Sequence, residues 1–491
     1  MAHPQRIAGA ALALAFFYLG LALRPFDALL AMPIAEDGWY ALTVARNVAN
    51  GRGVTIDGTV WTNGFQPLFT ALQALCFRLA PAPEAELRLF YGLAWLAHCA
   101  GAMLVASLAR DAARDSASSA LAAPLAALLY LAAVKNFNDF YTGLETGLQL
   151  ALYALVWRLY ANDWRRRPAL MGLALGALVL ARIDAAVFVA VFCAAEFLRG
   201  PQSLAVRFRA CFVAGALAVL VSSPWWLYNT LLFGHPMPSS GFAQQDAVFE
   251  IERVWTALWA LRIVAMPWLF AGAHEALWTD LARVAAIAGT AVFVWRARDL
   301  VRPSPLLRFA GLLLLCYAGL VVYYTRTFFA DWFYIRYFAP LSLIAFVYLP
   351  ALLAARLPRA GAALGIAACI GSAALLAGAW QGAGLFGASA HHRQAALVTA
   401  HVPPQDAVAA GQSGTLGFLR DRVVNVDGKV NPEALEWRGR IPEYLDARGI
   451  RWFVDSDWYV EINLGLDPAA AGWQLVAENG DFYLYRRVGP R

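Results

Sequence analysis

The stretch that decides the fold is IAEDGWYALTVARNVANGRGVTIDGTVWTNGFQPLF, residues 34–69. Two adjacent acids, Glu36 and Asp37, stand near its start, and glycines interrupt the polar residues that follow. One apolar run precedes the stretch, and another apolar segment begins at Pro67. Carboxylates at the edge of a membrane segment are costly and usually serve a function. We therefore expect a polar loop between two membrane segments, with its acids at the membrane surface.

The whole chain has the composition of a membrane protein. Of its 491 residues, 60% are hydrophobic and 15% are charged, whereas about a quarter of the residues of a soluble protein are charged. Apolar runs long enough to cross a bilayer recur, from RIAGAALALAFFYLGLALR to GAALGIAACIGSAALLAGAW. The first run is too long for a signal peptide and lacks a small-residue cleavage site. The sequence predicts an all-α polytopic membrane protein with about 11–13 transmembrane helices.

Arginine-rich segments indicate which side of the membrane each loop faces. They lie between apolar runs, at residues 164–168, 199–209, 295–308 and 355–359. Basic loops normally face the cytoplasm, so the N-terminus is expected there and Glu36 and Asp37 on the outer side. Because the basic residues concentrate in these loops, the net charge of +6 predicts no nucleic-acid partner. Segments 67–79 and 253–280 fit either a full span or a partial or interfacial helix.

The last hundred residues differ in composition from the rest of the chain. From about residue 391 the charge rises, the apolar runs shorten, and Gly and Pro become frequent. Short strands are predicted in DAVAAG (406–411), RVVNVDG (422–428), RWFVDS (451–456) and DFYLYRRV (481–488), and a helical stretch in PEALEWRGRIPEYLDARG (432–449). We expect a membrane domain over residues 1–385, with a catalytic external loop at 31–66. A small soluble α/β domain is expected over 391–491, in the periplasm if the number of spans is odd.

Charged residues recur at the ends of apolar segments on the expected outer side. Glu145 begins one such segment, and Arg182 and Asp184 interrupt another. Asp331 and Arg336 flank a group of aromatic residues before a further span. A single Arg–Asp pair is more often structural than catalytic, and a terminal acid often caps a helix. Several such groups on one face are tolerated best when they line one aqueous cavity.

Acids and arginines at a bilayer surface suit a particular chemistry. A carboxylate can accept the proton of an attacking hydroxyl, and arginines can neutralise a phosphate that leaves. A substrate with a phosphate at the headgroup level and a hydrocarbon tail in the lipid fits this layout.

The opening stretch resembles the first external loop of the GT-C superfamily, membrane glycosyltransferases that use polyprenyl-phosphate sugars. The branch with arabinofuranosyl- and mannosyltransferase-like proteins is the most similar. The matching residues are Glu36, Asp37, Asn47, Gly51, Gly53, Thr62, Asn63, Gly64, Phe65, Pro67 and Leu68. Later motifs match in the same order: TGLETGL (142–148), ARIDA (181–185), PWWLYNTLLFGHPMPSS (224–240) and DWFYIRYFAP (331–340). The last part of the chain resembles the family only loosely, through GQSGTLGFLRDRVVNVDGKVN.

This resemblance implies a GT-C fold and the inverting transfer of a single sugar, such as arabinofuranose, from a polyprenyl-phosphate donor. The enzyme would act at the outer face of a bacterial inner membrane. Asp37 and Glu36 are the candidate bases. In many relatives the first acid of the pair is an aspartate, and here it is Glu36, so Asp37 is favoured because it keeps the expected residue type. Gln244 stands where relatives often carry a lysine, so other cations must bind the donor phosphate. Those expected to do so are Arg182, Arg336 and His235. The residues expected to bind substrate are Trp39, Tyr40, Asn63, Glu145, Asp184, Asp331 and Trp332.

Other assignments stay open at this point. An oligosaccharide ligase or oligosaccharyltransferase would use a similar amphiphilic donor, a polyprenyl-diphosphate glycan. A non-enzymatic transporter of lipid-linked sugars would place its charges near the midplane of the membrane and often has an inverted repeat. The acceptor can be a glycan, a lipid or a protein, and the aromatic residues also fit an interfacial belt in contact with membrane lipids. A divalent cation could bind between Glu36, Asp37 and Asp331, although no ligand spacing requires one.

Overall fold

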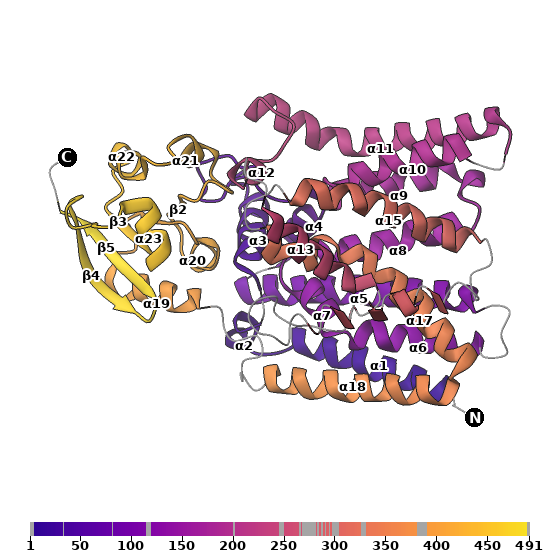
Figure 1. Ribbon diagram of the computed structural model, residues 1–491. Helices are drawn as coiled ribbons and strands as arrows, with labels where there is room; N and C mark the ends of the chain where they lie inside the picture. Colours follow the sequence, from indigo (N-terminus) through magenta and orange to yellow (C-terminus); the bar gives the residue numbers. More distant parts are fainter. Residues whose placement is uncertain are drawn as a thin grey trace.

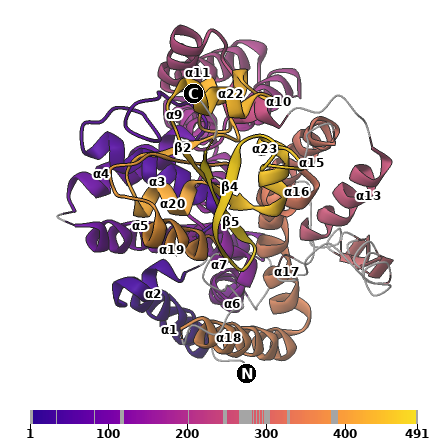
Figure 2. The same cartoon turned by 90° about the vertical axis from the view of Figure 1, so that its left-hand side faces the viewer.

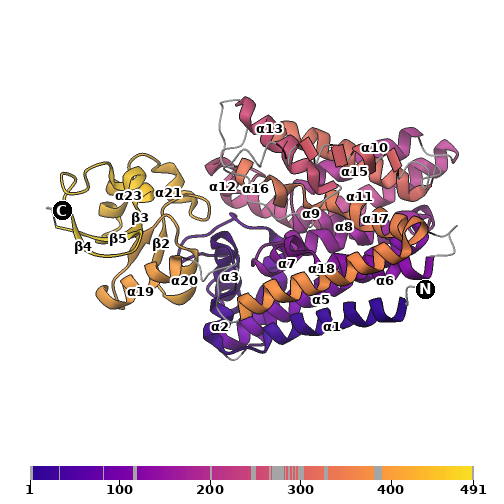
Figure 3. The same ribbon diagram turned by 60° about the horizontal axis from the view of Figure 1, so that its bottom comes forward.

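The computed structural model describes residues 4–32, 34–80, 82–113, 119–199, 202–244, 250–264, 304–325, 330–380 and 390–488, with isolated residues between 267 and 296. The side chains of residues 330–333 and 378–380 lie outside this description. A bundle of long helices makes up most of the molecule, and a smaller domain with a β-sheet stands at one end of it (Figure 1). The N-terminus lies at the opposite end of the bundle (Figures 1 and 3).

Helices lie side by side in the bundle, and most of them are apolar. They are α1 (Pro4–Ala22), α5 (Pro83–Ala112), α6 (Ser119–Ala132), α7 (Val134–Tyr141), α8 (Thr146–Ala161), α9 (Pro168–Ala181), α10 (Ala185–Arg199), α11 (Leu204–Phe233), α15 (Pro305–Tyr324), α17 (Ser342–Arg356) and α18 (Pro358–Trp380). Among the described residues, six helices are long and apolar enough to cross a membrane, and the bent pair α6 and α7 would make a seventh. Helix α11 exposes large apolar side chains such as Phe212 and Leu231, as expected of a helix that faces lipid. The chain is a multi-pass membrane protein.

The predicted number of about 11–13 spans is not tested by these helices. Helices α8, α9 and α10 belong to the bundle but have only 16, 14 and 15 residues. Residues 265–303 are described only in isolated pieces. Of the two ambiguous segments, the first forms α4 (Pro67–Arg78), whose 12 residues are too few to span a bilayer. The second is described only where it forms α13 (Ile251–Ala260) and the 3₁₀ helix η2 (Leu261–Val264).

The packing of α9 against α11 shows where the arginine-rich segments lie. The two helices run in the same direction and approach closely at two glycines: a Cβ atom on Gly172 would lie 2.6 Å from the carbonyl oxygen of Ala214, and one on Gly176 would lie 2.6 Å from Cβ of Val221. Helix α9 begins at the end of the segment 164–168, which contains the 3₁₀ helix η1 (Trp164–Arg166), and α11 begins within the segment 199–209. Both end toward the β-sheet domain. The arginines therefore lie at the far end of these helices from the acids of the opening loop.

Short elements form the end of the bundle that faces the β-sheet domain. They are α2 (Phe26–Leu30), α3 (Glu36–Ala49), α12 (Ser239–Ala243), α16 (Ala330–Tyr337) and the 3₁₀ helix η3 (Ala339–Leu341), together with α4 and α13. Helix α3 has both acids of the opening stretch in its first turn, where the helix dipole stabilises negative charge. It rests against the turn at Thr142, because a Cβ atom at Gly38 would lie only 2.1 Å from the carbonyl oxygen of Thr142.

The C-terminal domain contains a five-stranded sheet with strand order β2-β1-β3-β5-β4. Its strands are β1 (Val408–Ala410), β2 (Val423–Asn425), β3 (Trp452–Ser456), β4 (Trp473–Asn479) and β5 (Phe482–Arg487), and its helices are α19 (His391–His401), α20 (Gly414–Leu419), α21 (Pro432–Glu436), α22 (Ile441–Ala447) and α23 (Asp457–Leu464). Strand β1 is parallel to β2 and β3, whereas β5 is antiparallel to β3 and β4. The four predicted strands are confirmed; the sequence did not predict β4. The domain covers the end of the bundle that carries α3, with α20 against that helix (Figure 2).

Candidate functional site

A pocket of about 550 Å³ lies where the bundle, the opening loop and the C-terminal domain meet. Its charged lining residues are Asp37, Glu145, Asp184, Arg182, Arg336 and Lys429. Apolar side chains from α10, α11 and α15 complete the wall, among them Val187, Trp226 and Leu320. Val187 is 41% exposed and the neighbouring lining residue Tyr323 is 48% exposed, so this wall reaches the outer surface of the bundle. One side of the pocket is therefore charged and the other is apolar.

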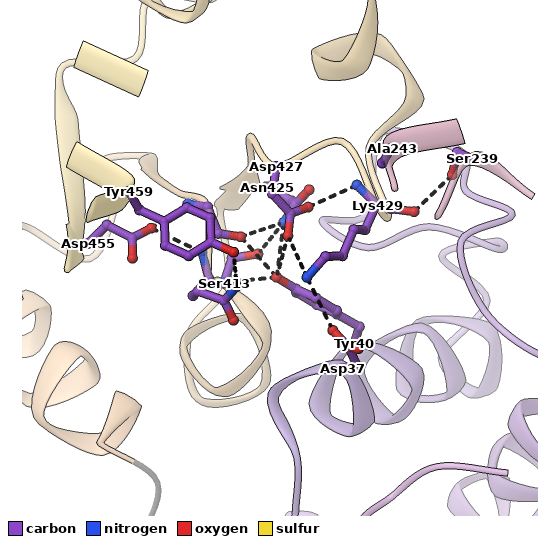
Figure 4. Close-up of polar contacts among 12 residues, drawn as sticks. Asp37, Tyr40, Ser239, Ala243, Ser413, Asn425, Asp427, Lys429, Asp455 and Tyr459 are labelled. Atoms are coloured by element: carbon purple, nitrogen blue, oxygen red, sulfur yellow. Dashed lines mark hydrogen bonds and ion pairs between the residues drawn. The ribbon is translucent and has the colours of Figure 1, made fainter. Parts of the chain in front are cut away.

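An ion pair between the first loop and the C-terminal domain borders the charged side. Nζ of Lys429 lies 3.6 Å from Oδ1 of Asp37 and 3.5 Å from Oδ2 of Asp427 (Figure 4). Tyr40, one turn after Asp37, donates a hydrogen bond of 2.9 Å to the carbonyl oxygen of Gly411. Its hydroxyl also lies 3.4 Å from Oδ2 of Asp427. Helix α3 and the loop of Lys429 thus hold one another in a fixed register.

The electrostatics of this cluster keep the Asp37 carboxylate ionised. Burial raises the pKa of Asp37, but the positive charges of Lys429 and Arg336 outweigh that effect and hold the pKa below its ordinary value. Burial lowers the pKa of Lys429, but the negative charges of Asp37 and Asp427 raise it by more, so the net shift is upward. Burial, supported by the charge of Asp37, raises the pKa of Asp427 although Lys429 opposes the shift. Asp37 is the carboxylate of this cluster that lines the pocket, and its pKa is the lowered one.

Arg182 is the centre of a second charged cluster that lines the same pocket. It follows α9, and its guanidinium donates hydrogen bonds of 2.7 Å to Oε1 of Glu145 and 3.0 Å to Oδ2 of Asp184. It also donates to the hydroxyl of Tyr324 at 3.1 Å, and Tyr324 in turn donates to Asp184. Its carbon Cζ lies 4.7 Å from the centre of the Tyr337 ring. Two carboxylates therefore compensate the charge of Arg182. This residue, which the sequence predicts to bind the donor phosphate, also forms structural ion pairs.

Arg336 lies on α16 and lines the same pocket. Its carbon Cζ is 5.2 Å from the centre of the Tyr337 ring. Its charge acts on Asp37, because it contributes to the lowered pKa of that carboxylate. The structure thus brings together Asp37, Tyr40, Glu145, Arg182, Asp184 and Arg336 of the predicted site residues.

Glu36 and Trp39 point away from the pocket, toward the C-terminal domain. The backbone N–H of Thr415 donates to Oε1 of Glu36 at 3.0 Å, and the Thr415 hydroxyl donates to Oε2 at 2.6 Å. Trp39 is buried with its ring 4.6 Å from that of Phe418. Successive residues on an α-helix point about 100° apart, so Glu36 and Asp37 face different directions. The Glu36 carboxylate attaches α3 to α20. It is not one of the described residues that line the pocket.

Two other predicted residues shape the loop after α11. The side-chain oxygen of Asn63 accepts a hydrogen bond of 2.9 Å from the backbone N–H of Ser239 and is fully buried. Nδ1 of His235 lies 2.6 Å from the carbonyl oxygen of Met237, and its ring packs on Phe242. Neither residue is part of the described pocket lining, because each is engaged with the backbone of this loop. The prediction that Asp331 and Trp332 bind substrate is not tested, because the structure describes only their backbone in α16 and not their side chains.

The sequence did not predict Lys429 as a site residue, although its side chain is the cation that pairs with the Asp37 carboxylate. Gln244 does line the pocket, and Lys429 stands beside it in the same wall. One signal was available in the composition: the chain has only two lysines among its 39 basic residues, Lys135 and Lys429. Lysine carries a compact charge on a flexible stem, unlike the planar guanidinium of arginine. A lysine in an arginine-rich chain therefore indicates a position where a compact charge on a flexible stem is useful.

The glycine of the Thr-Asn-Gly motif explains how Lys429 reaches the pocket. A Cβ atom at Gly64 would lie 1.9 Å from the carbonyl oxygen of Lys429. The same carbonyl oxygen accepts a hydrogen bond of 2.9 Å from the Ser239 hydroxyl. The opening loop and α12 thus hold the backbone at Lys429 from two sides.

The predicted cation site between Glu36, Asp37 and Asp331 finds no support in the described residues. No group of three His, Cys, Asp or Glu side chains among them could hold a metal ion. Glu36 is bonded to Thr415, and the side chain of Asp331 lies outside the description.

Comparisons with known proteins give structural neighbours only. No protein-family model matches the chain, and no curated protein matches its sequence. Among solved structures, ArnT from Cupriavidus metallidurans in the apo state has a TM-score of 0.60 at 14% identity, over 98% of this chain and 98% of that chain. The archaeal oligosaccharyltransferase AglB from Archaeoglobus fulgidus, in complex with an inhibitory peptide and a dolichol-phosphate, has a TM-score of 0.57 at 13% identity, over 97% of this chain and 74% of that chain. At these identities the likeness shows a shared fold.

Proposed function

This chain has the GT-C fold that its motifs predicted, and we propose that it is a glycosyltransferase that moves a sugar from a polyprenyl-phosphate donor. The observation that carries the proposal is the pocket itself. An ionised carboxylate, Asp37, and the cations Lys429 and Arg336 line one side, while apolar residues of α10 and α15 line the other side and reach the bundle surface. Such a pocket suits a donor whose phosphate and sugar are polar and whose tail remains in the membrane.

The charged side of the pocket has the groups that the transfer requires. An acceptor hydroxyl attacks the anomeric carbon of the donor sugar and gives its proton to the Asp37 carboxylate. The bond between that carbon and the phosphate oxygen breaks, and its electron pair leaves with the polyprenyl phosphate. Attack from the face opposite the phosphate inverts the anomeric configuration. Positioned proton transfer of this kind contributes about 10²- to 10⁴-fold to a rate.

Lys429 connects the proton transfer to the departure of the phosphate. While Asp37 is ionised, Lys429 forms an ion pair with it. When Asp37 takes the proton of the acceptor, that pair loses its negative partner, and the Lys429 charge can stabilise the new charge on the phosphate. Arg336 supports the phosphate from α16, and Arg182 acts mainly by orienting Glu145 and Asp184 toward the sugar. Charge-assisted hydrogen bonds of this kind are about twice as strong as neutral ones.

The distribution of arginines supports an orientation for the reaction. The arginine-rich segments before α9 and α11 lie at the far end of those helices from the pocket. Since basic loops normally face the cytoplasm, the pocket and the C-terminal domain would face the periplasm of a bacterial inner membrane. The donor sugar is proposed to be a pentofuranose such as arabinofuranose, and the acceptor a periplasmic glycan, lipid or protein.

An oligosaccharyltransferase reaction is the second candidate, because the fold is also that of AglB, which was solved with a peptide and a dolichol-phosphate. The two candidates differ in the donor. Binding of polyprenyl monophosphate and polyprenyl diphosphate to the purified protein would separate them, with tighter binding of the monophosphate expected for the leading proposal.

The decisive variant is Asp37→Asn. It keeps the shape of the side chain but removes the proton acceptor. We expect release of polyprenyl phosphate from a polyprenyl-phosphate pentose, in the presence of a membrane extract that supplies acceptor, to fall at least about 100-fold. Binding of polyprenyl monophosphate should be retained. The proposal fails if Asp37→Asn transfers sugar at the rate of the unaltered protein.

A further inference from the structure

A second pocket lies in the C-terminal domain, beside the first. Its volume is about 250 Å³, and α21, α23 and the end of α12 enclose it. Lys429 and Gln244 line both pockets, so these two residues form the wall between them. Figure 4 shows the Lys429 side chain directed toward Asp37 and Asp427. The second pocket therefore adjoins the carboxylate proposed to act as the base.

The walls of this second pocket combine an aromatic face with a few polar groups. Trp458 and Ile462, one turn apart on α23, are 45% and 55% exposed and form its rim. The Trp458 ring stands edge-on to Tyr459, with 4.6 Å between the ring centres. The polar lining residues are Asp427, Arg438 and Asn463. Trp458 is both half-exposed and part of the lining, so it offers an aromatic surface to the pocket.

The dimensions and the chemistry of the pocket both restrict that ligand. The volume is below the range of about 300–1,000 Å³ that is typical of sites for drug-sized molecules, so it accommodates one small ring system. A sugar ring has an apolar C–H face that can lie on Trp458 and hydroxyl groups at its edge. A carboxylate accepts hydrogen bonds from hydroxyls and a guanidinium donates them. Asp427 and Arg438 both line the cavity and supply these groups.

We propose that the second pocket binds a sugar ring of the acceptor and presents a hydroxyl of this ring, or of the one next to it, to Asp37 across the wall of Lys429 and Gln244. This assignment rests on the proposed function and specifies its acceptor as a saccharide, free or carried on a lipid or protein. Trp458 is a binding residue in this scheme, and it plays no part in holding the donor phosphate.

The test uses the full chain purified in detergent. A panel of neutral mono- and disaccharides is titrated and followed by saturation-transfer NMR, and polyprenyl monophosphate binding is measured in parallel. We expect at least one saccharide to bind, and Trp458→Ala to weaken its binding about tenfold or more. Trp458→Phe retains an aromatic face, so it should weaken binding less than about threefold. Leu466→Ala is the matched control: it removes an apolar side chain that is 86% exposed, just after α23 and outside the pocket lining.

The outcomes separate the pocket assignment from the donor proposal. If Trp458→Ala binds saccharide as well as the unaltered protein, or if no saccharide binds to protein that does bind polyprenyl monophosphate, the acceptor assignment is overturned. Binding of unglycosylated peptides, in place of saccharides, in a Trp458-dependent manner would also overturn it. If saccharides bind through Trp458 but polyprenyl monophosphate does not bind, the donor proposal fails and the sugar site remains.

Discussion

Replacement of Lys429 by methionine tests the electrostatic core of the site. The substitution keeps most of the length of the side chain and removes its charge, which lies 3.6 Å from Oδ1 of Asp37. Two unit charges about 4 Å apart interact with about 4 kcal/mol at an effective dielectric constant of about 20. Water screens part of this, because the side chain of Asp37 is 30% exposed, and the charge of Arg336 remains. We therefore expect the pKa of Asp37 to rise by about 1–2 units, within the range known for a carboxylate beside a single cation.

The sign of the expected change follows from the proposed role of Asp37 as a base. Only the ionised carboxylate accepts a proton, so activity is lost as the pH falls through the pKa of Asp37. In the unaltered protein this pKa is below its ordinary value, and the acid limb of the pH profile should lie correspondingly low. In Lys429→Met the limb should move upward by about 1–2 pH units. The measurement is the pH dependence of kcat/KM for release of polyprenyl phosphate.

Two further variants serve as controls for this experiment. Lys429→Arg preserves the charge, so its acid limb should stay near that of the unaltered protein even if the rate falls. Arg52→Met removes an ion pair with Asp421 at the same interface. The two side chains are 46% and 79% exposed, so their interaction is far weaker than that between Lys429 and Asp37. Its acid limb should not move. An unmoved acid limb in Lys429→Met would refute the account of the Asp37 carboxylate given above.

Three other substitutions test separate parts of the structure. Arg182→Met leaves two buried carboxylates without their cation and should destabilise the protein by about 3–5 kcal/mol, seen in denaturation in detergent; an unchanged unfolding curve would contradict the ion-pair role. Glu36→Gln weakens the bonds from Thr415 by about 1–3 kcal/mol, which should speed proteolysis of the C-terminal domain without shifting the pH profile. Gly64→Ala places a methyl group against the carbonyl oxygen of Lys429, so transfer should fall while the bundle unfolds at its usual temperature; full activity would show that the loop can yield.

The membrane part of the fold could be predicted because its signals are local. A run of about twenty apolar residues is sufficient to predict a helix in the bilayer, whatever lies next to it. The opening loop was recognisable for a similar reason, since its acids, glycines and the Thr-Asn-Gly motif are close together in the sequence. In the C-terminal domain, β4 was missed because its outward residues are mixed in character and its pairing with β5 contains an irregularity near Leu475.

The candidate site could be predicted only in part. Asp37, Arg182 and Arg336 stood out because a charge beside an apolar segment is rare and costly. The sequence could not tell Glu36 from Asp37, since the direction in which each points depends on how α3 is rotated about its axis. That rotation is fixed by the contact of Gly38 with the turn at Thr142, which belongs to a different part of the chain.

Composition and local motifs by themselves determined that this protein is a bundle of membrane helices with an acidic, glycine-containing polar loop, because hydropathy and short motifs depend only on neighbouring residues. Tertiary structure decided which groups meet. It brought Lys429, from the far end of the chain, to the Asp37 carboxylate, and it enclosed Arg182 between two acids. Charges act over a few ångströms of space regardless of their separation in sequence, so the identity of the cation beside Asp37 had to come from the folded chain.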